Sequence, residues 1–164
     1  MHTKTLNTLV LFLKKRTIEL IGIFLVAFSF FLLLALITYS PGDPNFLYTY
    51  DGKEINNIWG LYGSVASDFF FQSIGLISFF LTFNILIWGI FLIKKKYLNN
   101  FLRKKFFTVL YIIFGTTFIY IFSNDSFWLI DNGNSGFIGR LISENFINLL
   151  PIKRNAIFLT FHNF

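Results

Sequence analysis

Of the 164 residues, 55% are hydrophobic and only 13% are charged, against about 25% charged residues in soluble domains. Phenylalanine alone supplies 25 residues, more than a soluble fold of this size can bury, whereas lipid can surround them. There is no cysteine, which excludes disulfides, cysteine-ligated zinc and thiol nucleophiles. The composition therefore predicts an integral membrane protein, and its lipid-exposed backbone must satisfy its own hydrogen bonds within helices.

Three apolar runs, 20–37, 69–93 and 106–122, contain no Asp, Glu, Lys, Arg or His and are long enough to cross the ~30 Å hydrocarbon core of a bilayer. They predict transmembrane helices over 18–39, 69–93 and 106–123. The first run follows basic residues, as in a signal peptide, but it is longer than the ~7–15 apolar residues of a signal peptide and no small-residue cleavage site follows it. We therefore expect an uncleaved first helix and an all-α, polytopic transmembrane bundle.

The segments between these runs sort their charges by sign. Most of the 14 basic residues lie in the N-terminal segment 1–17 or in the loop 94–105, whereas acidic residues dominate the loop 40–68. Because loops rich in Lys and Arg stay in the cytoplasm, we expect 1–17 and 94–105 inside, and 40–68 and 124–154 outside. The basic residues that set this topology are Lys14, Lys15, Arg16, Lys94, Lys95, Lys96, Arg103, Lys104 and Lys105.

The chain after the third run has a different character. Apolar and polar residues alternate at helical spacing over 137–150, which predicts an amphipathic helix in the plane of the membrane interface. Pro151 ends this pattern. The segment 155–164 is again apolar and is expected to begin a fourth span. The expected fold thus has three full spans, an interfacial helix and an incomplete fourth span.

Three short motifs lie beside these runs, and each has a structural interpretation. In the turn 40–44, Pro41 cannot extend a helix, and the Asp-Pro pair favours a turn. The Trp-Gly segment 59–63 combines aromatic side chains suited to the membrane interface with glycines that allow close backbone approach. Asp68 is expected to cap the second helix. The glycine-rich segment 133–139 lacks a Gly-Lys-Ser/Thr ending, so we reject nucleotide binding there.

In this order the motifs resemble the N-terminal four-helix membrane domain of the FtsK/SpoIIIE family of bacterial DNA translocases. That family has a similar Tyr-Ser-Pro-x-Asp-Pro turn, a Trp-Gly-Gly segment before helix two and a glycine-rich segment before helix four. Here Gly60-Leu61 stands in place of the Gly-Gly pair. The residues that carry the resemblance are Ser40, Pro41, Asp43, Pro44, Trp59, Gly60, Gly63, Asp68, Gln72, Gly75, Gly136 and Gly139.

The resemblance implies a membrane anchor that works in chromosome partition and cell division. In the family, this domain tethers a hexameric, ATP-driven motor at the division septum and contacts other division proteins. The implied partners are therefore the lipid bilayer, further copies of the chain and division proteins, and the implied location is the bacterial inner membrane. The sequence contains no G-x-x-x-x-G-K-[ST] motif, so ATP, Mg²⁺ and DNA are implied only for a motor outside this sequence.

We accordingly expect no catalytic, cofactor-binding or metal-binding residue in this chain, which we interpret as a membrane-domain fragment or a truncated reading frame. His2 and His162 lie at opposite ends, without metal-ligand spacing. Two alternatives stay open: a small three-helix membrane interaction protein without a motor, and a transporter or channel subunit. Transport paths usually contain ionisable residues within the membrane. A transporter or channel would need polar groups that face a shared pore, and Gln72 with Asn84 is the only hint of such a pore.

Overall fold

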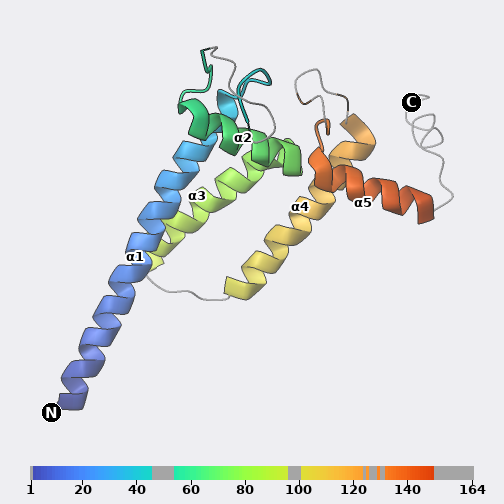
Figure 1. The fold of residues 1–164 in the computed structure, drawn as a ribbon. Helices are drawn as coiled ribbons and strands as arrows, with labels where there is room; N and C mark the ends of the chain where they lie inside the picture. The colour runs from blue at the N-terminus through green and yellow to red at the C-terminus, as the bar shows by residue number, and fades with distance from the viewer. Residues whose placement is uncertain are drawn as a thin grey trace.

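The computed structural model describes residues 2–45, 54–95, 101–123, 125, 129 and 132–149. All regular structure in this part of the chain is helical, which confirms the all-α fold class. The helices are α1 (His2–Ile37), α2 (Gly60–Ile74), α3 (Ile77–Lys95), α4 (Phe101–Ser123) and α5 (Gly136–Leu149). α1, α3 and α4 are long, whereas α2 and α5 are short and lie across the long helices towards the end opposite the N-terminus (Figure 1).

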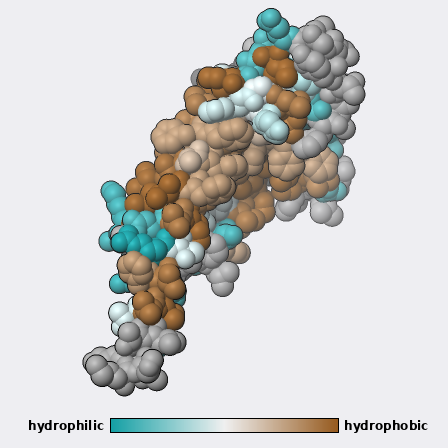
Figure 2. Space-filling view, turned by 60° about the vertical axis from the view of Figure 1, so that its left-hand side comes forward, coloured by the Kyte–Doolittle hydropathy of each residue, from teal (hydrophilic) through white to brown (hydrophobic). Residues whose placement is uncertain are grey.

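Three helices in the described residues are long and apolar enough to cross a membrane: Asn7–Ile37, Ile77–Lys95 and Arg103–Ser123. At about 1.5 Å per residue, α3 is about 28 Å long, close to the ~30 Å of a bilayer core. α1 is about 54 Å long by the same measure, so it exceeds the apolar layer. Figure 2 shows largely apolar side chains along the molecule, with a hydrophilic zone towards one end and further hydrophilic side chains at the opposite end. Apolar side chains also lie beyond the first of these zones.

The structure differs from the single helix expected over 69–93. α2 ends at Ile74 and α3 begins at Ile77, and Gly75 between them has a φ of 58°, which only glycine adopts readily. The Ser78 hydroxyl donates hydrogen bonds to the carbonyl oxygens of Gly75 (2.6 Å) and Phe70 (2.9 Å), which holds the chain at this break. The expected outward loop and the expected second span therefore share one helix, α2.

Other helix ends also differ from the expected ones. Asp68 lies in the interior of α2, so the expectation that it caps this helix is wrong; the cap position is occupied by Trp59. α1 extends to His2 and α4 begins at Phe101, because basic residues are compatible with a helix beyond its apolar part. The amphipathic helix expected over 137–150 corresponds to α5. The expected fourth span at 155–164 lies outside the described residues.

α1 packs mainly against α3, and small residues allow the two backbones to approach closely. A Cβ atom on Gly22 would lie 2.8 Å from the carbonyl oxygen of Gly89. Further along, the Ser29 hydroxyl donates a hydrogen bond to the carbonyl oxygen of Thr82 at 2.9 Å. Close contact and interhelical hydrogen bonds are the forces that join helices in lipid, where burial of apolar surface adds little.

The buried apolar cluster lies where α1 meets α2. Its members are Leu32, Leu36, Phe71 and Leu129. The ring of Phe71 meets those of Tyr39 and Phe79 edge to face, with centroids 5.0 and 5.6 Å apart. Such pairs add to the stabilisation from burial, so this cluster holds α2 across the end of α1.

Candidate functional site

Asp43 organises the turn that follows α1. This residue is only 5% exposed. One carboxylate oxygen accepts hydrogen bonds from the backbone and side-chain nitrogens of Asn56, both at 3.0 Å, and the other accepts one from the backbone nitrogen of Asn57 at 2.9 Å. Hydrogen bonds to a carboxylate are stronger than neutral ones. Asp43 therefore ties the turn after α1 to the segment that leads into α2.

Asn57 completes this connection, which we call the α1–α2 joint. Its amide nitrogen donates to the carbonyl oxygens of Ala35 (2.9 Å) and Thr38 (3.3 Å), at the end of α1 where carbonyls lack helical partners. Its amide oxygen accepts from the backbone nitrogen of Trp59 at 3.1 Å. A Cβ atom on Gly63 would lie 1.9 Å from that same oxygen, which explains why glycine is needed there.

Other residues of the first two motifs lie in the same joint. The Ser64 hydroxyl donates to the carbonyl oxygen of Pro44, and the Tyr39 hydroxyl donates to Asp68 at 3.3 Å. The Ser40 hydroxyl oxygen accepts from the side chain of Asn56 at 3.4 Å. Pro41 is exposed in the turn, and Gly60 starts α2 with a φ of 58°.

Several residues of this joint belong to the motifs of the sequence analysis, but Asn57 was not singled out there. The sequence feature that could have identified Asn57 is its position two residues before Trp59. There it forms a polar pair with Asn56 at the start of an otherwise apolar stretch. A buried amide that bridges two segments cannot be told from an exposed one by sequence alone.

A second connection, the α2–α5 joint, is built from glycines. A Cβ atom on Gly75 would lie 2.0 Å from the carbonyl oxygen of Asn134, and one on Gly136 would lie 2.4 Å from the backbone nitrogen of Gly75. Gly136 has a φ of 66°. The backbone nitrogen of Leu76 donates to the carbonyl oxygen of Asn134 at 2.9 Å. The two chain segments therefore cross at backbone distance.

Polar and small residues on either side support this joint. The side-chain nitrogen of Asn132 donates to the side-chain oxygen of Gln72 at 2.8 Å. A Cβ atom on Gly139 would lie 2.6 Å from the carbonyl oxygen of Thr116, so α5 also approaches the backbone of α4 closely. Gln72, Gly75, Gly136 and Gly139, which all carry the family resemblance, thus lie in or beside this joint.

The basic residues lie at the other end of the long helices. Lys14, Lys15 and Arg16 are exposed on α1, Lys94 and Lys95 end α3, and Arg103, Lys104 and Lys105 lie in the first turns of α4. Lys96 lies outside the described residues. Because α1 and α3 are antiparallel (Figure 1) and Gly22 lies against Ile93, the end of α3 lies near the basic turn of α1.

The geometry of the two joints indicates a structural role. The polar groups of both joints bond to one another and to helix ends, and they set the angles between helices. In the part of the chain that the structure describes, no group of three or more His, Cys, Asp or Glu residues could hold a metal ion.

Comparison with known proteins agrees with the motifs. The family described as the 4TM region of DNA translocase FtsK/SpoIIIE matches residues 14–162. The protein named DNA translocase FtsK from Rickettsia bellii (strain RML369-C) is 30% identical over 129 residues, which are 77% of this chain and 16% of the relative. Its namesake from Rickettsia prowazekii (strain Madrid E) is 32% identical over 133 residues, which are 79% of this chain and 17% of the relative.

The protein of the same name from Vibrio vulnificus (strain CMCP6) is 40% identical over a shorter stretch of 53 residues, or 32% of this chain and 5% of the relative. The chain thus spans only 16% and 17% of the length of the two Rickettsia relatives. No solved structure matches it.

Proposed function

The chain belongs to the family of 4TM membrane regions of FtsK/SpoIIIE DNA translocases, and from this we propose that it anchors an ATP-driven DNA motor in the membrane at the division site. The observation that carries the proposal is the family match over 14–162, which includes both joints. In this role the chain performs no catalysis. Its helices resist extraction from the bilayer, and its joints hold the helices at defined angles while the motor pulls on DNA.

The proposed orientation has the basic end in the cytoplasm and both joints outside. The described basic residues of α1, α3 and α4 lie at one end, where they favour the cytoplasmic face and its anionic lipids. A motor that acts on chromosomal DNA must attach on the inside. A chain that starts in the cytoplasm and crosses the membrane three times emerges on the outside. The proposal therefore includes a fourth crossing, which begins within 155–164 and returns the chain to the cytoplasm.

Reporter fusions test this orientation. A fluorescent protein inserted at Asn99 should fluoresce, and alkaline phosphatase inserted there should be inactive, because phosphatase folds only outside the cytoplasm. Insertions at Glu54 should give the reverse pattern. Changing the basic residues of 94–105 to Gln is the matched variant, and it should weaken the pattern. Phosphatase activity at Asn99 in the unchanged chain would contradict the proposed orientation.

Replacement of the membrane region in the full-length translocase tests the anchor role at the division site. An unrelated four-span region of the same topology should keep the motor in the membrane but remove it from the septum, so that chromosomal DNA is trapped by closing septa. Fluorescence microscopy of the two forms measures both effects. Normal septal placement with the unrelated region would show that this chain does not direct the protein to the division site.

The coding sequence beyond the Phe164 codon separates the proposal from the three-helix interaction protein. An open frame that contains the phosphate-binding motif G-x-x-x-x-G-K-[ST] supports a motor. A stop codon would remove the motor from the proposal. We also propose that copies of the chain assemble, as a hexamer by resemblance, and contact other division proteins. Cross-linking in cells tests this assembly, and recovery of monomer alone would contradict it.

A further inference from the structure

The first part of α2, over 60–69, has the reverse polarity of a helix on the surface of a water-soluble protein. Its face towards the bundle contains the buried residues Gly63, Ser64, Ser67 and Asp68, and the buried apolar residues Phe71 and Ile74 follow only in the second part of the helix. Its opposite face is apolar and aromatic. Leu61 is 48% exposed, Tyr62 83% and Phe69 55%, and Ile58 just before the helix is 61% exposed. Water would favour the opposite arrangement, because burial of the apolar face and solvation of the polar one would both lower the free energy.

The polar face of α2 is held in place by its own hydrogen bonds. The Ser67 hydroxyl donates to the carbonyl oxygen of Gly63 at 2.8 Å. Ser64 and Asp68 are bonded to the turn after α1 and to Tyr39, as described for the α1–α2 joint. The Ser67 bond lies within α2, but rotation of α2 to hide its aromatic face would break the bonds of Ser64 and Asp68 to Pro44 and Tyr39. The aromatic face therefore points away from the bundle in the folded chain.

The aromatic face continues the surface that the spans present to lipid. α2 lies across the end of α1 and runs directly into α3 (Figure 1). The ring of Trp59, at the start of α2, lies 5.4 Å from the ring of Phe31 in the membrane-spanning part of α1. Ile37, the last residue of α1, is 62% exposed and apolar. The lipid-covered surface of α1 therefore extends onto α2 without an intervening polar zone.

We propose that α2 is embedded in the bilayer leaflet at the end opposite the basic residues, with Leu61, Tyr62 and Phe69 among the lipid chains. The segment 60–68 is then a membrane-embedded element rather than part of an aqueous loop. Its polar face bonds to the bundle while its aromatic face is solvated by lipid. An in-plane helix of this kind fixes the depth and tilt of the spans, because either movement would drag its aromatic face into water.

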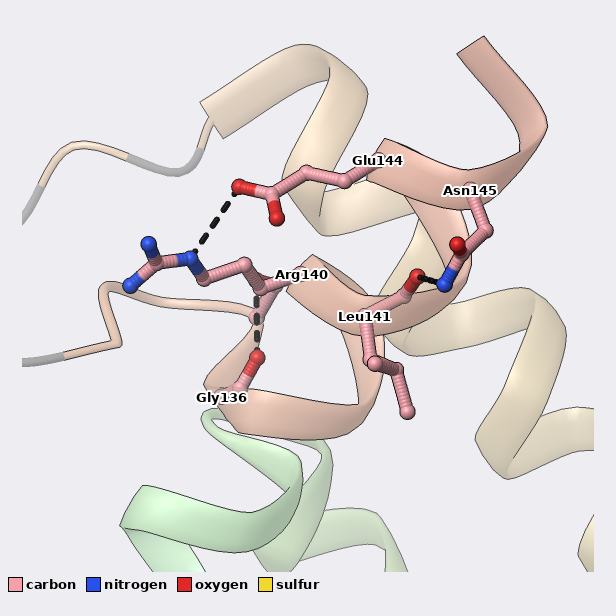
Figure 3. A network of polar contacts seen from close by, with 6 residues as sticks. Gly136, Arg140, Leu141, Glu144 and Asn145 are labelled. Carbon is pink, nitrogen blue, oxygen red and sulfur yellow. Dashed lines mark hydrogen bonds and ion pairs between the residues drawn. The ribbon is translucent and has the colours of Figure 1, made fainter. Parts of the chain in front are cut away.

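α5 provides an internal comparison because its exposed surface is mixed. Phe137 (52%) and Leu141 (47%) are exposed, but the same helix presents an ion pair in which Arg140 Nε lies 3.1 Å from a carboxylate oxygen of Glu144. Figure 3 shows this pair on one side of α5 and Leu141 on another. α5 therefore has a water-facing side, and it should lie less deeply than α2.

The absence of cysteine allows a direct test, because any introduced cysteine is the only one. Nitroxide labels are attached to Tyr62→Cys and Phe69→Cys in the whole chain reconstituted into vesicles. Collisions are measured with oxygen, which concentrates in lipid, and with a water-soluble nickel complex supplied on both sides. Glu54→Cys is the water-exposed control, and Phe83→Cys, on the exposed face of α3, is the lipid-exposed control.

The proposal predicts that labels at positions 62 and 69 collide with the nickel complex much less often than the label at position 54. Their collision rates with oxygen should equal that of the label at position 83. Nickel collisions equal to those at Glu54 would overturn it, because the face would then be in water. Protection from both reagents would also overturn it, because protein would then cover the face. Circular dichroism checks the helix content of each variant. Tyr62→Cys keeps the test available if Phe69→Cys does not fold, since the Tyr62 side chain is largely exposed.

Discussion

α3 and α4 are two spans of equal hydropathy with different packing. Their most apolar stretches have the same mean hydropathy of 1.9, yet 28% of that stretch is buried in α3 and only 6% in α4. α3 faces α1 through glycine contacts and the Ser29–Thr82 hydrogen bond. α4 packs chiefly against α5, where Gly139 lies against the backbone of α4. Hydropathy thus identifies a span, whereas small and polar positions decide what it packs against.

The halves of the molecule also differ in how they are connected. Within α1 to α3, helix contacts run along the membrane-spanning length as well as through the α1–α2 joint. The second half, α4 and α5, meets the first mainly at the α2–α5 joint. A change in that joint should therefore separate the halves, whereas a change between α1 and α3 should loosen only the first half.

The largest effect is expected for Gly75→Ala, which breaks the connection between the halves. The new Cβ would meet the backbone of Asn134 at 2.0 Å, and it would add the cost of a positive φ. We expect a loss of folding free energy on the order of 3–5 kcal/mol, measured by unfolding in mixed micelles. Gly60→Ala is the matched control, because Gly60 has the same φ but no atom within 4 Å of the new Cβ. Equal losses of folding free energy in the two variants would show that the close backbone contact in the α2–α5 joint does not contribute to stability.

Asp43→Ala should have the next largest effect, confined to the first half. Three hydrogen-bond donors would lose their acceptor in a joint that excludes most water. We expect a loss of about 2–4 kcal/mol and faster proteolysis of the segment 38–59, while protection of α4 and α5 is unchanged. Glu54→Ala, an exposed acidic residue nearby, should change stability by less than about 0.5 kcal/mol. Proteolysis that increases equally in both halves would contradict this localisation.

Gly89→Ala and Gly115→Ala sharpen the difference between α3 and α4. A Cβ on Gly89 would meet the backbone of α1, 2.8 Å from the carbonyl oxygen of Gly22, whereas one on Gly115 would meet the movable end of the Ile77 side chain at 2.7 Å. We expect a cost of about 1–3 kcal/mol for Gly89→Ala and less than about 1 kcal/mol for Gly115→Ala. Thermal unfolding in detergent measures both, and a larger cost at Gly115 would reverse the comparison.

The smallest effect is expected for the Arg140–Glu144 pair on α5. Both side chains are about half exposed, at 51% and 50%, so solvent weakens their attraction. A double-mutant cycle with Arg140→Ala and Glu144→Ala should give a coupling of about 0.3–0.5 kcal/mol that decreases as salt is added. A coupling insensitive to salt would show that the pair is shielded, and α5 would then lie deeper than its mixed surface implies.

Sequence alone was sufficient to predict the class of the fold, the three spans and the amphipathic helix over 137–150. These features depend on local composition and periodicity: about 18 or more apolar residues span a bilayer wherever they fold. The family resemblance could likewise be recognised from the motifs at 40–44, 59–63 and 136–139. The contacts that their residues make were not predictable.

Only the tertiary structure decided where the expected second span breaks and which residues meet. Gly75, at the end of α2, has no room for a side chain because Asn134 and Gly136, far along the chain, occupy the space beside it. Asp68 is inside α2 because that helix starts at Gly60, and Asn57 became central only when the end of α1 lay within hydrogen-bond distance. Such contacts join segments that are remote in sequence, and their strength depends on distances and angles that no local pattern encodes.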